Sequence, residues 1–497
     1  MTSYEGVVNK TQSRGTGHDL AGIRVLVVGL AREGTAAARF LVARGARVTV
    51  TDAKPTGALA EPLAALQGLP IELALGGHPE SLLEAADVLV VSPGVPLEIP
   101  LLVRARQRGL PLSSETRLFT HLCPAPVAGI TGSSGKTTTT ALVGEMLQAT
   151  GRRTWVGGNI GHPLLEHLPE IGPDDAVVME LSSFQLEFFA PWPGVGMAAE
   201  PGSPLLDPTG WSPPLAALLN VTPNHLDRHG TMAAYTAAKA HILAHQRTGD
   251  VAVLNLDDPV CREMEERICR GAGARVLWFS LEDEPQEGSF LRGQQLVLRL
   301  ASQEWTICGR EDLQLLGRHN VANALAALTL AGEAGAPVEA LRHVVTSFAG
   351  VEHRLELVRQ EHGVRWYNDS IATSPERTMA ALRAFQAPIV LLAGGRDKHL
   401  PWEEMAALAW HKVQHLILFG EAAGKVEAAM ARTRPPEAGY ETAIHRAGTL
   451  EGAVALAHRL ARTGDVVLLS PGGTSFDVYR DFVERGEHFR RLVQALE

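Results

Sequence analysis

Short apolar runs alternate with longer amphipathic stretches along most of the chain. The run IRVLVVG, which starts at Ile23, is typical of a buried strand, and TAAARFLVARG after it has helical spacing and ends at Gly45. RVTVTD and ADVLVVSPG, which ends at Gly94, add two further strands. This alternation predicts an α/β fold in which helices cover parallel sheets.

The strand-like runs fall into three sets. The second set is APVAGIT, DAVVMELSS, PLAALLNVT and DVAVLNLD, and the third is PIVLLAGGRD, HLILFG and DVVLLSPGG. Candidate boundaries lie at HLCPAP and at FAGV. Because 497 residues are enough for about three domains, we predict domains at 1–122, 123–348 and 349–497. We expect the polar first stretch of about 20 residues to be frayed.

The composition narrows the classes of function. A net charge of −10 gives no general positive field for nucleic acid. The chain has no apolar run of the roughly 18 residues that a membrane-spanning helix needs. Its four cysteines have no paired spacing, which suits a reducing compartment. We therefore expect a cytoplasmic protein without nucleic-acid or membrane partners.

The stretch GITGSSGKTTTTALVGEML, residues 129–147, has the features of a phosphate-binding loop that opens a helix. It departs from the strict pattern G-x-x-x-x-G-K-[ST], because Ile130 occupies the first glycine position. Amides at a helix N-terminus bind anions, Lys136 would neutralise the outer phosphates, and Thr137 would bind Mg²⁺. The sequence thus predicts a nucleotide site, and the alternative is an ordinary strand–helix turn.

Polar side chains follow two later strands of the second set. Glu180 lies in MELSSFQLE, His225 lies in LLNVTPNHLDRHG, and Lys239 lies on the helix AAYTAAKAHIL. Because ligands bind at the carboxyl ends of parallel strands, Glu180 and His225 are predicted to converge beside the phosphate loop. Each residue also has a plain structural interpretation, and the spacing His225-x-Asp227-x-His229 lacks the third ligand of a zinc site.

The first strand–turn–helix, VVGLAREGTAAARF, is similar to a dinucleotide-binding fingerprint, with Asp52 at the end of the next strand. The spacing of Gly29 and Gly34 does not fit that fingerprint. Ala31 stands where the middle glycine would let a pyrophosphate approach the backbone. The sequence therefore gives little support for NAD binding.

Several segments, taken together and in order, resemble the Mur ligases. They are VGGNIG, MELSSFQLE, NVTPNHLDRHG, AAKAHI, GRHNVANALAA, HRLE, NDSIAT, LLAGGRDK, LLSPGGTSFD and DFVERGEHF. The resemblance runs from Ile23 to the C-terminus. LSSFQLE and SPGGTSFD are similar to segments of the D-glutamate-adding member, and the D-N-P-R segment of the diaminopimelate- or lysine-adding member is absent.

This resemblance implies a Rossmann-like N-terminal domain, a central P-loop-type ATP-binding domain and a Rossmann-like C-terminal domain. It also implies an ATP-dependent acid–amino-acid ligase of peptidoglycan precursor synthesis, which forms an amide through an acyl phosphate. The substrates would be UDP-N-acetylmuramoyl-L-alanine, D-glutamate and ATP. The cofactor would be Mg²⁺, with two ions, and we expect a monomer.

The resemblance assigns roles to individual residues. The residues that contact ATP would be Gly132, Ser133, Ser134, Gly135, Lys136, Thr137, Thr138, Asn320 and Asn323 near the adenine, Asp369 on the ribose and Arg354 at the terminal phosphate. The catalytic residues would be Lys136, Glu180, His225 and Lys239. The metal ligands would be Thr137, Glu180, His225 and Lys239, the last after carbamylation. A carbamate turns the lysine into a carboxylate, which suits Mg²⁺.

Two further sets complete the implied sites. The residues that contact the UDP substrate would be Leu30, Ala31, Asp52, Lys54, Gly94 and Asn159. The residues that receive glutamate would be Thr373, Lys398, Ser475 and Phe482. A lysine and two hydroxyl groups suit the carboxylates of glutamate.

Three features depart from the family pattern. Ile371 stands in NDSIAT where many Mur ligases have lysine, so a positive charge is missing that Arg377 or Arg396 could replace. The two serines of TGSSGK replace Thr-Asn, a mild change because backbone amides do most of the binding. The stretch 191–214 is longer than the family's usual connection, and we expect a neutral surface loop.

Other classes of protein stay open at this point. A phosphotransferase or motor-type ATPase would use the phosphate loop, but it has no obvious use for the GGRDK and SPGGTSFD segments. A non-catalytic nucleotide sensor would use the first domain without turnover. Nearer alternatives are another Mur ligase or a folylpolyglutamate synthetase, and the sequence does not distinguish D- from L-glutamate.

Overall fold

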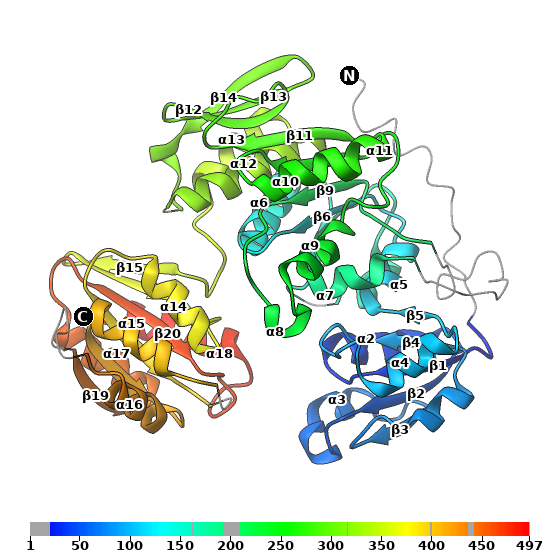
Figure 1. Cartoon of the computed structure of the whole chain (residues 1–497). Coiled ribbons are helices and arrows are strands. Elements are labelled where there is room, and N and C mark those ends of the chain that lie inside the picture. Colours follow the sequence, from blue (N-terminus) through cyan, green and yellow to red (C-terminus); the bar gives the residue numbers. More distant parts are fainter. Residues whose placement is uncertain are drawn as a thin grey trace. The chain divides into compact units, whose positions relative to one another are not determined.

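The computed structural model describes residues 20–161, 163–191, 209–315, 317–397, 400–435 and 442–496. The chain divides into two compact units, Met1–Phe348 and Ala349–Glu497. Among the described residues, the first unit contains a five-stranded and a nine-stranded sheet, and the second contains a six-stranded sheet (Figure 1). The predicted α/β fold class with three sheet-containing domains is confirmed. The expected frayed start and most of the stretch 191–214 lie outside the described residues.

The first sheet has five parallel strands in the order β3-β2-β1-β4-β5. Because β1 lies between β2 and β4, the winding of the chain reverses there, and ligands bind such sheets at the carboxyl ends of these strands. Every residue of β4 is buried, as in strands covered on both faces. The elements are β1 (Arg24–Val28), α2 (Arg32–Ala43), β2 (Arg47–Asp52), α3 (Ala60–Ala65), β3 (Ile71–Leu75), β4 (Val88–Val91), α4 (Pro100–Gln107) and β5 (Leu112–Ser113).

The second sheet has the order β14-β13-β12-β11-β10-β9-β6-β8-β7. The strands from β7 to β12 along this order are parallel, whereas β12, β13 and β14 are antiparallel neighbours, which the sequence analysis did not predict. The helices are α5 (Glu115–Leu122), α6 (Lys136–Gln148), α7 (Ser183–Leu186), α8 (Leu226–His229), α9 (Met232–Ala240), α10 (Pro259–Met264), α11 (Arg270–Ala272), α12 (Arg318–Glu333) and α13 (Val338–Ser347). The strands are β6 (Val127–Thr131), β7 (Thr154–Gly158), β8 (Ala176–Glu180), β9 (Leu215–Leu218), β10 (Val251–Asn255), β11 (Arg275–Ser280), β12 (Gly288–Arg292), β13 (Gln295–Leu300) and β14 (Gln303–Gly309).

The third sheet has the order β15-β16-β20-β17-β18-β19, with β15 antiparallel at its edge. Its elements are β15 (Glu356–Glu361), β16 (Val364–Asn368), α14 (Pro375–Arg383), β17 (Ile389–Gly394), α15 (Glu403–Lys412), β18 (Val413–Phe419), α16 (Ala423–Arg432), β19 (Ala443–Gly448), α17 (Leu450–Leu460), β20 (Val466–Gly472) and α18 (Phe482–Gln494). Short 3₁₀ segments and one π-helical segment join longer elements of the first unit: η1 (Thr56–Ala58), η2 (Glu80–Ala85), η3 (Leu164–Glu170), η4 (Glu187–Phe189), η5 (Glu265–Cys269, the π-helical segment) and η6 (Arg310–Asp312).

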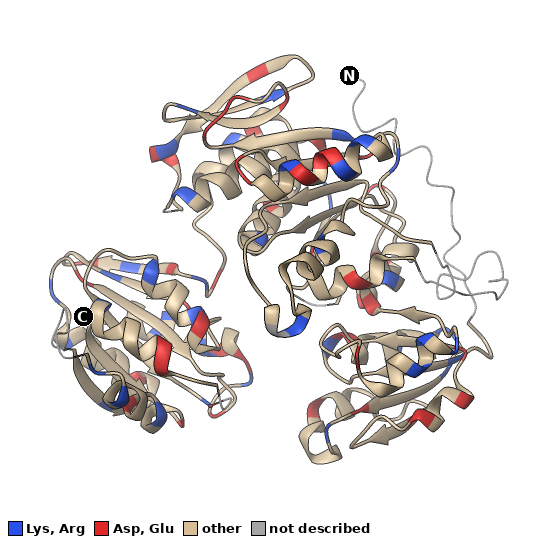
Figure 2. Ribbon diagram, viewed as in Figure 1, with Lys and Arg blue, Asp and Glu red and all other residues tan. Residues whose placement is uncertain are grey.

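Each unit has its own apolar core. In the first unit one cluster runs from the first sheet, through Leu118 and Phe119 of α5, to the second sheet, so these two sheets share buried surface. In the second unit separate clusters cover the two faces of the third sheet. Basic and acidic residues are interspersed over the elements of each unit (Figure 2). Among the described residues, no helix combines the length and the apolar character that a bilayer crossing requires.

Candidate active site

The phosphate loop joins the end of β6 to the start of α6, and the segment after β9 holds it in place. The amide of Ser134 donates to Asn220 Oδ1 over 3.0 Å, and Asn220 Nδ2 donates back to the carbonyl of Ser134 over 3.2 Å. Ser133 Oγ donates to the carbonyl of Thr222 and lies 3.0 Å from the hydroxyl of Tyr235. These bonds fix the shape of the loop in advance, which lowers the entropy cost of binding an anion.

Two asparagines of α12 lie against this loop. Gly135 has a φ of +83°, and a Cβ atom at Gly135 would lie 2.2 Å from Asn323 Oδ1. Asn323 in turn donates to Asn320 Oδ1 over 3.1 Å. The structure therefore brings together the phosphate loop and the two asparagines that the resemblance assigned to the adenine.

Gly135→Ala is expected to weaken ATP binding at least about tenfold, because the new methyl group would push Asn323 away from the loop. Gly151→Ala is the matched control. Gly151 has nearly the same φ, +84°, but a Cβ there would meet no heavy atom within 4 Å. Both variants suffer a similar backbone strain of about 1 kcal/mol. The difference between their calorimetric Kd values for ATP therefore reports the effect of the contact with Asn323. Equal affinities for the two variants would contradict this prediction.

Two lysines converge on the carbonyl oxygen of Gly132. Lys136 Nζ lies 3.0 Å from it, and Lys239 Nζ lies 2.8 Å from it. Lys239 is 1% exposed. Burial, helped by the charge of Lys136, lowers the pKa of the Lys239 amine well below its usual value, against the attraction of Glu180. A depressed pKa enriches the unprotonated amine, which is the form that reacts with CO₂, so carbamylation of Lys239 is chemically feasible.

Glu180 ends β8 beside β6, where Ile130 is its register partner. Its side chain is 2% exposed, and Oε1 accepts a hydrogen bond from Asn159 Nδ2 over 2.7 Å. Oε2 is buried and has no hydrogen-bond partner among the described residues. Because an unsatisfied buried carboxylate oxygen is costly, this atom fits a cation, and Mg²⁺ prefers carboxylate and hydroxyl oxygens such as those of Glu180 and Thr137.

His225 lies directly before α8, with a φ of +52°. Its backbone amide donates to Asn224 Oδ1 over 2.9 Å, and its ring meets the ring of Phe184 edge-on, with centroids 5.1 Å apart. His225 therefore lies beside the segment that carries Glu180, and its side chain stays exposed. The side chain of Asp227 lies outside the described part of the structure, so the zinc alternative for His225, Asp227 and His229 is not tested.

The residues implied for the UDP substrate gather at the switch point of the first sheet. Asp52 Oδ2 accepts a hydrogen bond from the amide of Leu30 over 2.7 Å, and Oδ1 accepts one from the amide of Lys54 over 2.8 Å. Both oxygens of Asp52 thus shape the turns after β1 and β2. Ala31 is the N-cap residue of α2, and Gly94 lies on the turn after β4, the neighbour of β1. Asn159 is the exception among the residues implied for the UDP substrate. It lies in the second sheet's domain and donates to Glu180.

The second unit brings another group of predicted residues to the carboxyl ends of β16 and β20. Asp369 Oδ2 accepts a hydrogen bond from Ser470 Oγ over 2.8 Å, and Oδ1 accepts one from the amide of Leu355 over 3.3 Å. Burial raises the pKa of Asp369 to about 7, against the Ser470 hydrogen bond and the charge of Arg354. The carbonyl of Phe482 accepts a bond from Ser370 Oγ, so the loops after the two strands are joined. Thr373 and Ser475 lie on these same loops, whereas Lys398 lies outside the described residues.

Asp369→Asn is expected to raise the free energy of unfolding at about pH 8 and to change it little at about pH 4. The folded state raises the pKa of this carboxyl from 3.8 to about 7, so wild-type stability is lost as pH rises between these values. Asparagine keeps an acceptor for Ser470 and removes the ionisable group, which gives a gain of a few kcal/mol at most. Denaturant titrations at both pH values check this, and a gain that does not depend on pH would contradict it.

Arg485 of α18 is fully buried and bonds to the same loops. Its Nε donates to Ser370 Oγ over 3.0 Å, Nη2 donates to the carbonyl of Ser370 over 2.8 Å, and Nη1 donates to the carbonyl of Gly473 over 3.1 Å. Burial lowers the pKa of Arg485 to about 10. The sequence analysis gave this residue no role, because an arginine within a charged helix normally points to solvent.

One of the two cations considered as replacements for the missing lysine lies at the NDSIAT loop. Arg377 Nη1 donates to the carbonyl of Ile371 over 3.0 Å, and the charge of Arg377 acts on Asp369. Arg396 Nε lies 3.9 Å from Glu421 Oε2. Arg377 is thus placed to carry the positive charge of this loop, and its role toward a ligand stays a prediction.

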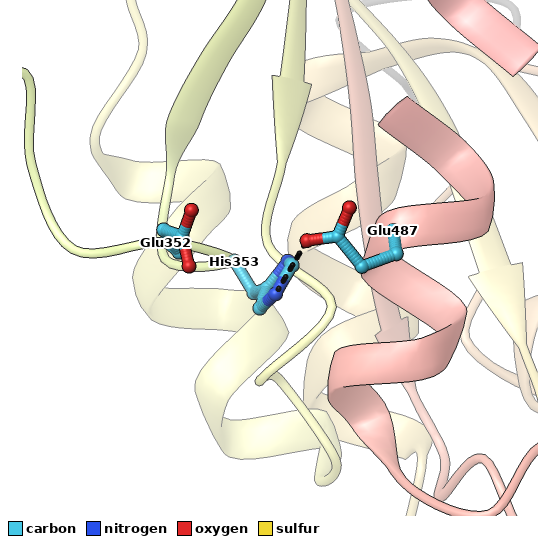
Figure 3. Close-up of side chains that lie close together, drawn as sticks. All are labelled: Glu352, His353 and Glu487. Atoms are coloured by element: carbon cyan, nitrogen blue, oxygen red, sulfur yellow. Dashed lines mark ion pairs between the residues drawn. The ribbon is translucent and has the colours of Figure 1, made fainter. Parts of the chain in front are cut away.

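One group of described side chains has the spacing of a metal site. The ligand atoms of Glu352, His353 and Glu487 all lie within 4.8 Å of one another (Figure 3). However, Arg490 Nη1 lies 2.5 Å from Glu487 Oε1, and Nη2 lies 3.3 Å from Glu352 Oε1. The guanidinium already balances these carboxylates and would repel a metal ion. We interpret the group as an ion-pair network that supports the turn of Arg354.

Three family models match successive parts of the chain. The Mur ligase MurD-like N-terminal domain matches residues 23–114. The Mur ligase middle domain matches residues 130–193 and 205–331, and the Mur ligase glutamate ligase domain matches residues 353–473.

Curated relatives match nearly the whole chain. The UDP-N-acetylmuramoylalanine–D-glutamate ligase of Symbiobacterium thermophilum is 45% identical over 476 residues, which cover 95% of this chain and 98% of the relative. The protein of the same name from Pelotomaculum thermopropionicum is 40% identical over 479 residues, with coverages of 95% and 98%. The crystal structure of UDP-N-acetylmuramate–alanine ligase from Thermotoga maritima has a TM-score of 0.54 at 18% identity and covers 95% of this chain and 99% of that one. At this identity the structural likeness supports the fold alone.

Proposed function

The chain belongs to the Mur ligase family, as the resemblance predicted, and we propose that it joins D-glutamate to UDP-N-acetylmuramoyl-L-alanine with ATP as the energy source. Relatives at 45% and 40% identity carry the name of this activity over nearly their whole length. The observation that carries the proposal is the cluster at the ends of β6 and β8, where Lys136, Lys239 and Glu180 meet the phosphate loop. The reaction is a cytoplasmic step of peptidoglycan precursor synthesis in this proposal, and the enzyme acts as a monomer.

The first step would transfer the terminal phosphoryl group of ATP to the substrate carboxylate. ATP and the carboxylate are both anions, and Lys136 together with the amides at the start of α6 reduces their repulsion. The bond between the terminal phosphorus and ADP breaks while a carboxylate oxygen forms a new bond to phosphorus. The product is an acyl phosphate, whose acyl carbon an amine can attack.

The donor set around the phosphate loop would hold Mg²⁺. Thr137 and Glu180 would bind one ion, and His225 with carbamylated Lys239 would bind another, which makes the number of ions part of the proposal. Glu180 fits this role because its buried Oε2 has no hydrogen-bond partner among the described residues. A bound ion supplies positive charge to the phosphoryl oxygens.

In the second step the amine of D-glutamate would attack the acyl carbon, and phosphate would leave from the tetrahedral intermediate. The second unit would bind glutamate through Thr373, Lys398, Ser475 and Phe482. Arg354 would face the terminal phosphate of ATP, and Asp369 would bind the ribose. Water would have to be kept away from the acyl phosphate until the amine attacks, because hydrolysis would return the carboxylate.

The test is a panel of amino acids assayed with ATP and UDP-N-acetylmuramoyl-L-alanine, with the product identified by mass. The proposal expects phosphate release and an amide product when D-glutamate is present, with L-glutamate, diaminopimelate and lysine much poorer. Steady ATP hydrolysis without an amide would favour a phosphotransferase or ATPase. Amide formation with a different amino acid would favour another member of the family.

A further inference from the structure

Arg228 of α8 joins the segment of His225 to a loop of the first sheet's domain. Its Nη2 donates to the carbonyl of Val95 over 2.9 Å, and its guanidinium nitrogens lie 3.5 Å from the carbonyl oxygens of Pro93 and Gly94. Its side chain is 14% exposed. One guanidinium therefore contacts three successive carbonyls of the turn after β4.

The other side of the guanidinium is held within the second sheet's domain. It lies 3.7 Å from Glu187 Oε2 and 4.9 Å from the ring centroid of Phe184. The same Phe184 ring contacts His225 edge-on at 5.1 Å and stacks on His229 at 5.4 Å. Arg228 thus belongs to the packed group that sets the position of His225.

Arginine suits this position better than lysine. Its planar guanidinium carries five N–H donors in a fixed geometry, so it can serve several carbonyl oxygens at once and still lie flat on an aromatic ring. The ammonium of lysine is a compact charge with no planar face to stack.

We propose that Arg228 is a positioning residue for the UDP substrate, which holds the Pro93–Val95 turn and the His225 segment at a fixed separation. The inference rests on the proposed function, with Gly94 as an implied contact of the UDP substrate and His225 as a proposed Mg²⁺ ligand of the reaction. A substrate bound at both ends needs both loops in register, and a displacement of about 1 Å can cost roughly a hundredfold in rate. Loss of Arg228 should therefore raise the KM for the UDP substrate more than the KM for ATP or for D-glutamate.

Arg106 provides a matched control on the same turn region. It lies on α4 and donates to the carbonyl of Leu97 over 2.6 Å, and this bond stays within the first sheet's domain. Arg106→Gln thus removes a comparable arginine–carbonyl bond and a charge that also acts on Glu187, but it leaves the bonds of Arg228 to the Pro93–Val95 turn in place.

The experiment measures kcat, the three KM values and the melting temperature for the full-length wild type, Arg228→Gln, Arg228→Lys and Arg106→Gln. Arg228→Gln is expected to raise KM for UDP-N-acetylmuramoyl-L-alanine at least about tenfold, with KM for ATP and D-glutamate within about twofold of wild type. Arg228→Lys should be nearly as impaired, and Arg106→Gln should resemble wild type.

Two results would overturn the inference alone. The first is a KM for the UDP substrate that stays within about twofold of wild type in Arg228→Gln. The second is a parallel rise of all three KM values with a lower melting temperature, which would mean a purely structural role. A wild-type enzyme that forms no amide would instead refute the proposed function, and the inference with it.

Discussion

Lys136→Ala is expected to lower kcat/KM for amide formation about a hundred- to a thousandfold while the protein stays folded. Lys136 lies over the phosphate loop, with Nζ 3.0 Å from the carbonyl of Gly132. It is the charged side chain proposed to offset the repulsion between ATP and the carboxylate, and removal of one such group typically costs about a hundred- to a thousandfold. The checks are product mass, phosphate release and the thermal unfolding curve.

The control for this variant is Lys412→Ala. Lys412 ends α15 in the second unit, donates to the carbonyl of Phe385 over 2.8 Å, and belongs to none of the proposed sites. It should keep near-normal activity. A Lys136→Ala enzyme with the activity of the Lys412→Ala control would refute the assignment of the phosphate loop.

Glu180→Gln is the second substitution with a large expected effect, at least about a hundredfold in rate. The change keeps the shape and the acceptor for Asn159, and removes the charge of the buried carboxylate whose Oε2 has no hydrogen-bond partner among the described residues. Loss of one carboxylate should also raise the Mg²⁺ concentration needed for half-maximal rate. Stability should stay within about 1 kcal/mol, because glutamine keeps the hydrogen bond to Asn159 and removes the cost of burying a charge.

The exposed Glu145 on α6 offers the matched control, since Glu145→Gln removes a carboxylate of the same domain from outside the site. Its rate and its Mg²⁺ dependence should match those of wild type. If Glu180→Gln also kept the wild-type rate and Mg²⁺ requirement, Glu180 would not be a metal ligand.

The parts of the site that the sequence predicted are those that follow buried parallel strands. β6, β8 and β9 are continuous apolar runs that end at a glycine-rich loop, at Glu180 and before Asn220, so pattern alone placed their ends at one edge of a sheet. The Mur ligase resemblance then identified the family, and the family models and relatives confirm it. The roles of the individual site residues stay predictions.

Features set by local backbone geometry were harder to predict. The turn between β13 and β14 is formed by Ala301 and Ser302, both with positive φ values of 49° and 63°. Glycine and asparagine normally mark such turns, so the β13–β14 turn carried no clear signal. The contact of Asp52 with the UDP part stays a prediction, and the backbone amide bonds that both of its oxygens accept were not predicted.

Buried arginines were missed for a different reason. Arg228 and Arg485 each serve carbonyl groups on segments far away in the sequence, and nothing in their immediate neighbours reveals this. Tyr235, buried against Ser133 of the phosphate loop, received no role in the sequence analysis. Such contacts depend on the tertiary fold, which brings together segments that are far apart in the sequence.

The account rests on the transfer of a phosphoryl group from ATP to a carboxylate before the amide forms. The most direct measurement labels both oxygens of the alanyl carboxylate of UDP-N-acetylmuramoyl-L-alanine with oxygen-18 and analyses the released phosphate by mass. The account predicts one oxygen-18 atom in each phosphate, in step with amide formation. Phosphate without label, released while the amide accumulates, would contradict the acyl phosphate and with it the proposed mechanism.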